Sequence, residues 1–245
     1  MAERLKIAAI VLAAGNGTRM NSEEKKQFMD LGGIPVLCHS LQAFEENPAV
    51  DTVVLVTGAE DLERALKLCI SRKNSKVKNI VAGGKMRFQS VFNGLLALPP
   101  ETDYVLIHDA ARPLLSQEVI RNCIKGAYTK QACVAAVKEK NTIKRGDGQG
   151  YAVETLDRSA LYEVQTPQAF SYRLILGAYY KLKKTIEEYK ADVSWITDDA
   201  VIVENMTDCK VAFVEGDYKN LKITTSEDLL IAEALLRASG EGQKS

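Results

Sequence analysis

The feature of this sequence that most constrains its fold is the alternation of short apolar runs with amphipathic stretches. Five apolar runs have the length and composition of strands, at Ile7–Leu12, Thr52–Thr57, Val77–Val81, Tyr104–His108 and Cys133–Val137. The stretches between them have helical patterns, at Val36–Glu45, Asp61–Ser71, Phe88–Leu98 and Glu118–Tyr128. This order predicts an α/β fold in which crossover helices join the strands of a parallel sheet.

Composition excludes several classes of protein. The 245 residues are 46% hydrophobic and 26% charged, which is ordinary for one globular domain with a sizeable core. Lysine plus arginine and aspartate plus glutamate each number 32, so no overall basic field favours nucleic-acid binding. No apolar run approaches the roughly 18 residues of a membrane-spanning helix. The five cysteines are scattered without a C-x-x-C pair, which favours free thiols in a reducing cytoplasm over disulfides or zinc.

The alternation breaks at Lys138–Gln165. There a polar turn, Lys144–Gly150, separates two runs that can pair, so we expect a hairpin that protrudes from the α/β body. A long excursion of this kind is usually an active-site lid or an oligomerisation arm. The elements expected beyond it are a helix at Tyr172–Tyr189, a capped helix starting at Thr197–Asp199, a strand at Lys210–Val214, a helix at Glu227–Arg237 capped by Thr225 or Ser226, and a frayed tail at Ala238–Ser245.

The first loop is the strongest indication of phosphate binding. Small residues, Ala13–Thr18, follow the first apolar run, and the cations Arg19, Lys25 and Lys26 come next. A strand that leads into a glycine-rich turn can present backbone N–H groups to phosphate. The loop matches neither the P-loop nor the dinucleotide motif, and a tight strand–helix connection is the alternative interpretation. The clustered cations favour phosphate.

Two further loops follow strands of the same predicted sheet. Gly83–Lys85 leads into a helix that begins near Arg87 and Ser90, and a cationic helix N-terminus favours an anion. Asp109 ends the fourth strand, where a carboxylate can hold Mg²⁺ with substrate phosphates as further ligands. The alternatives are an exposed basic face for the first loop and, for Asp109, a turn cap paired with Arg112. These loops should share one crevice, because ligands bind beyond the carboxyl ends of parallel strands.

His108, the last residue of the fourth predicted strand, is expected to be packed or hydrogen-bonded rather than catalytic. The other histidine, His39, lies too far away in the sequence for the two to suggest a metal triad.

Taken in order, the motifs resemble those of the 2-C-methyl-D-erythritol 4-phosphate cytidylyltransferases. They are VLAAGNGTRM, Lys26–Gln27, Gly83–Gly84 with Arg87 and Ser90–Val91, HDAARP, Asn141–Lys144, Asp157–Arg158, Gln165–Phe170, Thr197–Ala200 and Leu221–Thr224. The resemblance covers about residues 7 to 235. It implies a Rossmann-like nucleotidyltransferase with a mixed sheet flanked by helices. The whole chain, residues 1–245, would form one domain, with a β-arm at about residues 138–165 that interlocks two protomers.

The resemblance also implies a reaction and its site residues. CMP would pass from CTP to 2-C-methyl-D-erythritol 4-phosphate, with Mg²⁺ or another divalent cation held by Asp109. The implied CTP-binding residues are Ala13, Ala14, Gly15, Gly17, Gly83, Arg87, Ser90, Asp109 and Ala110. The implied catalytic residues are Arg19, Lys26, Arg158 and Lys222. The implied acceptor-binding residues are Asp109, Arg112, Thr142, Arg158, Thr197 and Lys222.

The chemistry explains why no histidine or cysteine nucleophile is expected. A phosphate monoester is already anionic at neutral pH, so no dedicated general base is needed. The catalyst must instead bring two anions together and stabilise the charge that develops, which requires positioning and cations.

The chain departs from the family pattern at three positions. Lys25 stands where the family usually has proline, Asn141 where it has aspartate, and Asp199 where it has glutamate.

Two alternative functions stay open. A ribitol 5-phosphate cytidylyltransferase would have the same fold, with glycine in place of Ala14 and valine in place of Ala111, so the alanines favour methylerythritol phosphate. A catalytically silent nucleotide-binding protein would be expected to lose Arg19, Lys26, Asp109 or Lys222, and the sequence retains all four.

Overall fold

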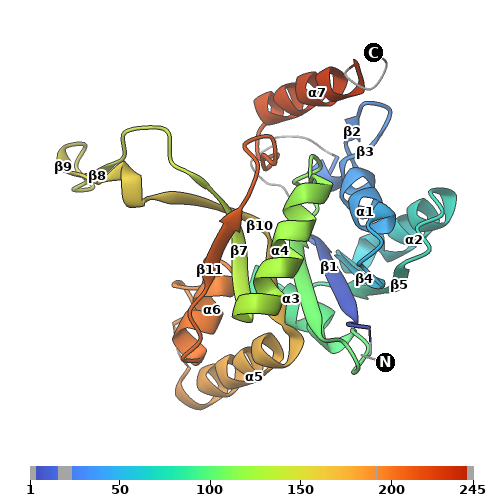
Figure 1. Cartoon of the computed structure of the whole chain (residues 1–245), viewed down its shortest axis with the longest axis horizontal. Coiled ribbons are helices and arrows are strands. Elements are labelled where there is room, and N and C mark those ends of the chain that lie inside the picture. Colours follow the sequence, from blue (N-terminus) through green and yellow to red (C-terminus); the bar gives the residue numbers. More distant parts are fainter. Residues whose placement is uncertain (1–3, 16–23, 191, 242–245) are drawn as a thin grey trace.

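A seven-stranded sheet forms the centre of the computed structural model, which describes residues 4–15, 24–190 and 192–241 (Figure 1). The strand order across the sheet is β11-β7-β10-β6-β1-β4-β5. The strands are β1 (Ile7–Ala13), β4 (Thr52–Thr57), β5 (Val77–Ala82), β6 (Tyr104–Asp109), β7 (Ala132–Lys138), β10 (Tyr162–Ser171) and β11 (Ala212–Glu215). The five strands predicted from apolar runs are therefore confirmed, and β11 lies close to its predicted position.

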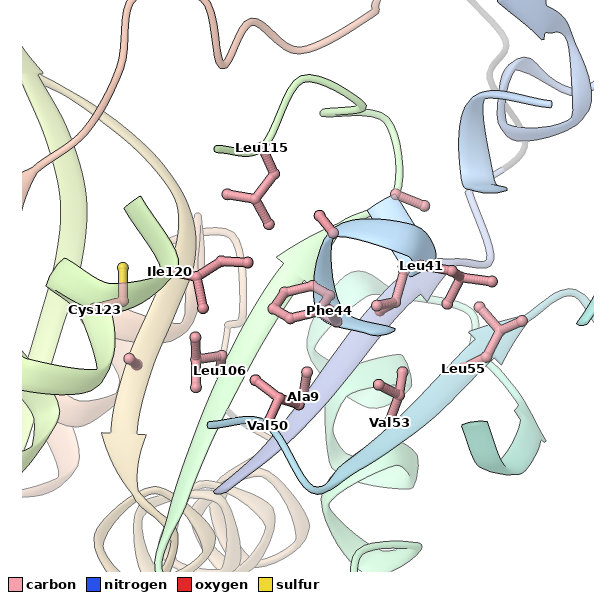
Figure 2. Close-up of a cluster of buried hydrophobic side chains, with 14 of the residues drawn as sticks. Ala9, Leu41, Phe44, Val50, Val53, Leu55, Leu106, Leu115, Ile120 and Cys123 are labelled. Atoms are coloured by element: carbon pink, nitrogen blue, oxygen red, sulfur yellow. The ribbon is translucent and has the colours of Figure 1, made fainter. Parts of the chain in front are cut away.

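Helices cover both faces of this sheet. One face packs against α1 (Val36–Glu46), α2 (Leu62–Ser71) and α4 (Gln117–Lys130), and the other against α3 (Arg87–Leu96), α5 (Tyr172–Tyr189) and α6 (Asp199–Met206). β1 contributes to both cores, because successive side chains of a strand point to opposite faces. Ala9 and Val11 belong to the first core and Ala8 and Ile10 to the second. Figure 2 shows Phe44 of α1 packed over the sheet in the first core.

The sheet is mixed, as the family resemblance implies, rather than wholly parallel as the alternation of elements predicts. β10 pairs antiparallel with both β6 and β7, while the other neighbours are parallel. No strand was predicted at β10, which contains Pro167, a residue that cannot donate to a ladder. The β10–β7 ladder is irregular between Val164 and Gln168, the segment that contains Pro167.

The predicted hairpin is present and projects from the sheet, at the left of Figure 1. Its strands are β8 (Lys144–Gly146) and β9 (Ala152–Thr155), and both are exposed at every position. The prediction of a turn over the whole of Lys144–Gly150 is wrong at its first residues, because Lys144–Gly146 pairs with β9. We call residues 139–161, between β7 and β10, the arm.

The C-terminal helix α7 (Ser226–Glu241) packs beside a small hairpin of β2 (Asp30–Leu31) and β3 (Ile34–Pro35) that was not predicted. Thr225 caps α7, since its Oγ1 accepts a hydrogen bond from the Asp228 N–H at 3.4 Å. The predicted fraying from Ala238 is wrong for residues 238–241, which are helical, and residues 242–245 lie outside the described part. None of the described helices has the length and apolarity to cross a membrane. All five cysteines are free thiols, as expected.

Candidate active site

The loops that follow β1, β4, β5 and β6 enclose a cleft of about 620 Å³ at the carboxyl edge of the sheet. The cleft brings together ten residues that the family resemblance assigns to the site, namely Ala13, Ala14, Gly15, Lys26, Gly83, Arg87, Ser90, Asp109, Ala110 and Lys222. Its walls also include the segment Gly58–Glu60 after β4, and Gly84, Lys85 and Met86 after β5. Neither β4's loop nor Met86 was expected in the site.

Close packing requires glycine at position 83. A Cβ atom built there would lie 2.5 Å from the Ala14 Cβ and 2.7 Å from the Ser90 Oγ. The Ser90 hydroxyl accepts a hydrogen bond from the Gly84 N–H at 3.0 Å, which fixes the turn into α3. The loops after β1 and β5 can therefore approach each other closely, and the backbone of both lines the cleft.

Gln27 holds the first loop in place, a role that the sequence alone did not reveal. Its side chain is buried, and its Nε2 donates to the carbonyls of Ala13 at 2.8 Å and Gly15 at 3.1 Å. The side chain belongs to a short 3₁₀ helix, η2 (Lys26–Phe28), which directly follows Lys25. The adjacent Lys26 lines the cleft, and its Nζ lies 3.3 Å from the carbonyl oxygen of Ile223.

Asp109 lies between two cations. Its Oδ2 is 2.6 Å from the Lys222 Nζ, and its Oδ1 is 3.3 Å from the Arg87 Nη2. Burial alone would raise the pKa of Asp109, but Arg87 and Lys222 hold that pKa well below its ordinary range. The alternative Asp109–Arg112 ion pair does not form among the described residues, since the Arg112 Nη1 donates to the Asn220 carbonyl at 2.7 Å. The expected turn is present, because the Arg112 N–H donates to the Asp109 carbonyl at 2.9 Å, and the Arg112 charge also helps to lower the pKa of Asp109.

A buried acidic group on the far side of Arg87 holds this guanidinium in place. The Arg87 Nη1 lies 2.9 Å from the Oδ2 of Asp199, and the Tyr179 hydroxyl donates to the Asp199 Oδ1 at 2.6 Å. Burial would lower the pKa of Arg87, but Asp199 and Asp109 raise it, so the guanidinium stays charged. The aspartate at position 199 thus has a partner on each oxygen, and it links α5 and α6 to the cleft.

His108, next to Asp109 on β6, is a neutral and fully buried side chain that hydrogen-bonds to residues around the cleft. The Thr166 hydroxyl accepts from the Asp109 N–H at 3.1 Å and donates to the His108 Nδ1 at 3.0 Å. The His108 Nε2 then donates to the Arg112 carbonyl at 3.1 Å, which assigns the proton to Nε2. Burial lowers the pKa of His108 to about 4. The expectation of a packed, hydrogen-bonded histidine is confirmed.

Lys25, at the position where the family usually has proline, pairs with two acids that follow β4. Its Nζ lies 2.6 Å from the Asp61 Oδ2 and also contacts the Glu60 carboxylate. Both acids belong to η3 (Ala59–Asp61), which follows β4. Lys26 is therefore the lysine of this pair that lines the cleft.

The structure does not bring every expected residue into the cleft. Arg112 is buried behind it, and Thr197 is exposed just before α6. Thr142 and Arg158 are exposed on the arm, where the Arg158 Nη1 donates to the Lys140 carbonyl at 3.2 Å. Gly17 and Arg19 lie outside the described residues.

The donor set at the cleft fits one kind of metal ion. Within the described residues no three His, Cys, Asp or Glu side chains form a group that could hold a metal. In the described part of the chain two carboxylates line the cleft, Asp109 at the end of β6 and Glu60 after β4, and neither belongs to such a group. This arrangement suits an ion such as Mg²⁺, which keeps waters and takes most of its other ligands from substrate phosphates.

Comparison with known proteins gives one consistent answer. Residues 7–238 match the family model described as 2-C-methyl-D-erythritol 4-phosphate cytidylyltransferase. Relatives of that name from Lachnospira eligens and Pelotomaculum thermopropionicum are 44% and 43% identical, with 94% and 95% of this chain and 98% and 95% of theirs covered. The solved 4-diphosphocytidyl-2C-methyl-D-erythritol synthase of Anaerococcus prevotii has a TM-score of 0.78 at 33% identity, covering 96% of this chain and 100% of that one.

Proposed function

The chain belongs to the 2-C-methyl-D-erythritol 4-phosphate cytidylyltransferase family, and we propose that its cleft is where CMP passes from CTP to 2-C-methyl-D-erythritol 4-phosphate. The products are 4-diphosphocytidyl-2-C-methyl-D-erythritol and pyrophosphate, in the non-mevalonate synthesis of isoprenoid precursors. The observation that carries the proposal is the meeting of ten expected site residues around one cleft, with Asp109 held between Arg87 and Lys222.

CTP would bind with its phosphates against the loops after β1 and β5. Ala13, Ala14, Gly15 and Gly83 leave backbone exposed to the cleft, and Ser90 fixes the second loop. Lys26 lines the same cleft, where its charge can stabilise the triphosphate as pyrophosphate departs. The family resemblance assigns the same role to Arg19 and adds Gly17 and Ala110 to the CTP site.

Asp109 and Lys222 lie where the two substrates would meet. A phosphate oxygen of the acceptor attacks the α-phosphorus of CTP, and pyrophosphate leaves in line, so the protein must position two anions. Lys222 would orient the acceptor phosphate, and Asp109 keeps that ammonium in the cleft. When bound to Asp109 and the phosphates, Mg²⁺ would neutralise charge on the triphosphate.

The arm would serve the acceptor in a second protomer. Thr142 and Arg158 are exposed, and neither lines the cleft of its own chain. β8 and β9 form only a two-stranded hairpin, which on its own is marginally stable in water. A homodimer would cover the arm and bring Thr142 and Arg158 to the partner's cleft, with Thr197 and Lys222 completing the acceptor site. We regard residues 1–245 as one domain with this arm, in a cytoplasmic enzyme whose thiols stay reduced.

An acceptor assay tests the activity. Purified protein with CTP and Mg²⁺ should release pyrophosphate only when 2-C-methyl-D-erythritol 4-phosphate is added. Turnover with ribitol 5-phosphate in its place would overturn the choice of acceptor, although Ala14 and Ala111 argue against that substrate. CTP binding without turnover of either acceptor would indicate the silent nucleotide-binding alternative.

A further inference from the structure

Lys25 pairs with two acids beside the cleft, Asp61 and Glu60, of which Glu60 lines it. Its ammonium lies 2.6 Å from the Asp61 Oδ2 and contacts Glu60, and its side chain is 24% exposed. Glu60 lines the cleft on the β4 side, while Lys26, the next residue along the chain, lines it too. A carboxylate here would repel a ligand that carries several negative charges, unless a cation compensates it.

The same two segments are joined by a second set of contacts. The Arg64 Nη1 lies 2.6 Å from the Glu24 Oε1, and the Arg64 guanidinium carbon lies 4.1 Å above the centre of the Phe28 ring. Glu24 and Phe28 flank Lys25 and Lys26, and Arg64 is on α2 immediately after η3. Residues 24–28 therefore contact the segment after β4 through ion pairs and through one cation–π contact.

We propose that Lys25 is a positioning residue for CTP. It compensates Glu60 and Asp61 next to the triphosphate, and it anchors the start of η2, from which Lys26 enters the cleft. This inference rests on the proposed function, because it assumes that the cleft receives a nucleoside triphosphate. It assigns a role to a residue at which this chain differs from the usual family pattern.

The charge of Lys25 persists at neutral pH. Burial would lower the pKa of Lys25, but hydrogen bonds and attraction from Asp61 and Glu60 outweigh burial and raise it. The pair with Asp61 is also better shielded than a typical surface pair, because the aspartate side chain is only 12% exposed. A methionine at position 25 would keep the length of the side chain and remove the charge.

The test compares Lys25→Met with wild type. We expect KM for CTP to rise about three- to tenfold, the size of a partly exposed charge interaction, with kcat within about twofold. Affinities for CTP, CDP and CMP should fall most for CTP and least for CMP, because the uncompensated carboxylates repel each added phosphate charge. Glu60→Gln in the Lys25→Met background should recover part of the loss, and Lys25→Arg should resemble wild type.

Lys67→Met is the matched control. Lys67 forms an equally short pair, 2.6 Å from the Glu63 Oε1, on the exposed face of α2 away from the cleft. Its loss should leave KM for CTP unchanged. An unchanged KM in Lys25→Met, an equal loss of affinity for CTP and CMP, or no recovery with Glu60→Gln would each overturn the proposal. A wild-type protein without turnover would instead overturn the proposed function. Thermal unfolding of each variant identifies a folding defect. If Lys25→Met has such a defect, the single variants Lys25→Arg and Glu60→Gln replace it in the comparison of KM for CTP.

Discussion

The cleft and the arm both carry charged side chains, but these side chains are held in place in different ways. In the cleft, Asp109 and Arg87 are held by several partners from elements far apart in the sequence, including Lys222 and Asp199. On the arm, every residue of β8 and β9 is exposed, and the Arg158 guanidinium donates a hydrogen bond to the backbone of the arm itself. The cleft is thus arranged within one chain, whereas under the proposed function the arm would need contacts from a second chain to bring Arg158 to a substrate.

Under the proposed function, each region would control a different part of catalysis. Charges that are fixed before substrate binds cost little reorganisation during reaction, which suits the phosphoryl-transfer centre. Exposed groups on a hairpin can be recruited by association with another molecule, which suits recognition of the acceptor. The predictions that follow separate these two roles.

The largest effect is expected in the cleft. Lys26→Ala should reduce kcat by about a hundredfold or more, because it removes a cation that acts on charge developing in the transition state. Steady-state pyrophosphate release measures the loss, and Lys67→Ala on the exposed face of α2 is the control. Wild-type turnover in Lys26→Ala would mean that the triphosphate binds elsewhere.

The stability of the fold should decrease at acidic pH because His108 is buried in its neutral form. Its pKa, lowered from 6.5 to about 4, means that the folded protein holds this histidine neutral while the unfolded chain takes up a proton below pH 6.5. The free energy of unfolding is therefore unaffected by this group above pH 6.5. It falls by on the order of 3 kcal/mol as the pH drops from 6.5 toward 4. The chain has only two histidines, so NMR titration with His39→Gln for assignment measures the value directly. Titration of His108 near 6.5 would contradict its buried neutral state.

An effect on the acceptor alone is expected from the arm. Arg158→Ala should raise KM for 2-C-methyl-D-erythritol 4-phosphate by about tenfold or more, the size of a hydrogen bond to a charged group, and leave KM for CTP unchanged. Arg145→Ala removes another exposed arginine, one paired with Glu154 on the arm, and should leave both KM values unchanged. A rise in KM for CTP in Arg158→Ala would break the division of roles between cleft and arm.

The smallest effect is a contrast between two Tyr→Phe substitutions. Tyr179→Phe removes the hydroxyl that donates to the buried Asp199 and should cost about 1–3 kcal/mol of unfolding free energy. Tyr151 is 74% exposed on the arm, and Tyr151→Phe should change stability by no more than about 0.5 kcal/mol. Urea unfolding of both variants makes the comparison, and equal effects would show that the cleft is not the more tightly arranged region.

Much of the fold could be predicted because its signals are local. The apolar runs that became β1, β4, β6 and β7 are largely buried, the edge strand β5 packs against the same two cores, and the helices between them contribute apolar side chains to these cores. β10 was missed because Pro167 and its polar neighbours resemble a loop, and only an irregular ladder accommodates them. The β2–β3 hairpin had a signal that was not used, the Gly32–Gly33 pair, whose positive φ angles suit a tight turn.

Some residues of the candidate site could also be predicted from local signals, and others could not. Glycines and charges that follow strands could be placed, because strand ends meet at one edge of a parallel sheet. Gln27, Thr166 and Tyr179 could not, because nothing local distinguishes a buried polar side chain from an exposed one. Their roles depend on how η2, β10 and α5 pack around the cleft, which only the folded chain determines.

Mixing two impaired variants, assayed at an acceptor concentration well below KM, tests most directly whether cleft and arm come from different protomers. If the arm acts in the partner's cleft, a dimer of Lys26→Ala with Arg158→Ala has one intact site, so an equimolar, re-equilibrated mixture should recover about a quarter of wild-type activity. If each arm serves its own cleft, both sites of the mixed dimer lack one residue. Activity no higher than the mean of the two variants, with mixed dimers confirmed by mass spectrometry, would contradict the account.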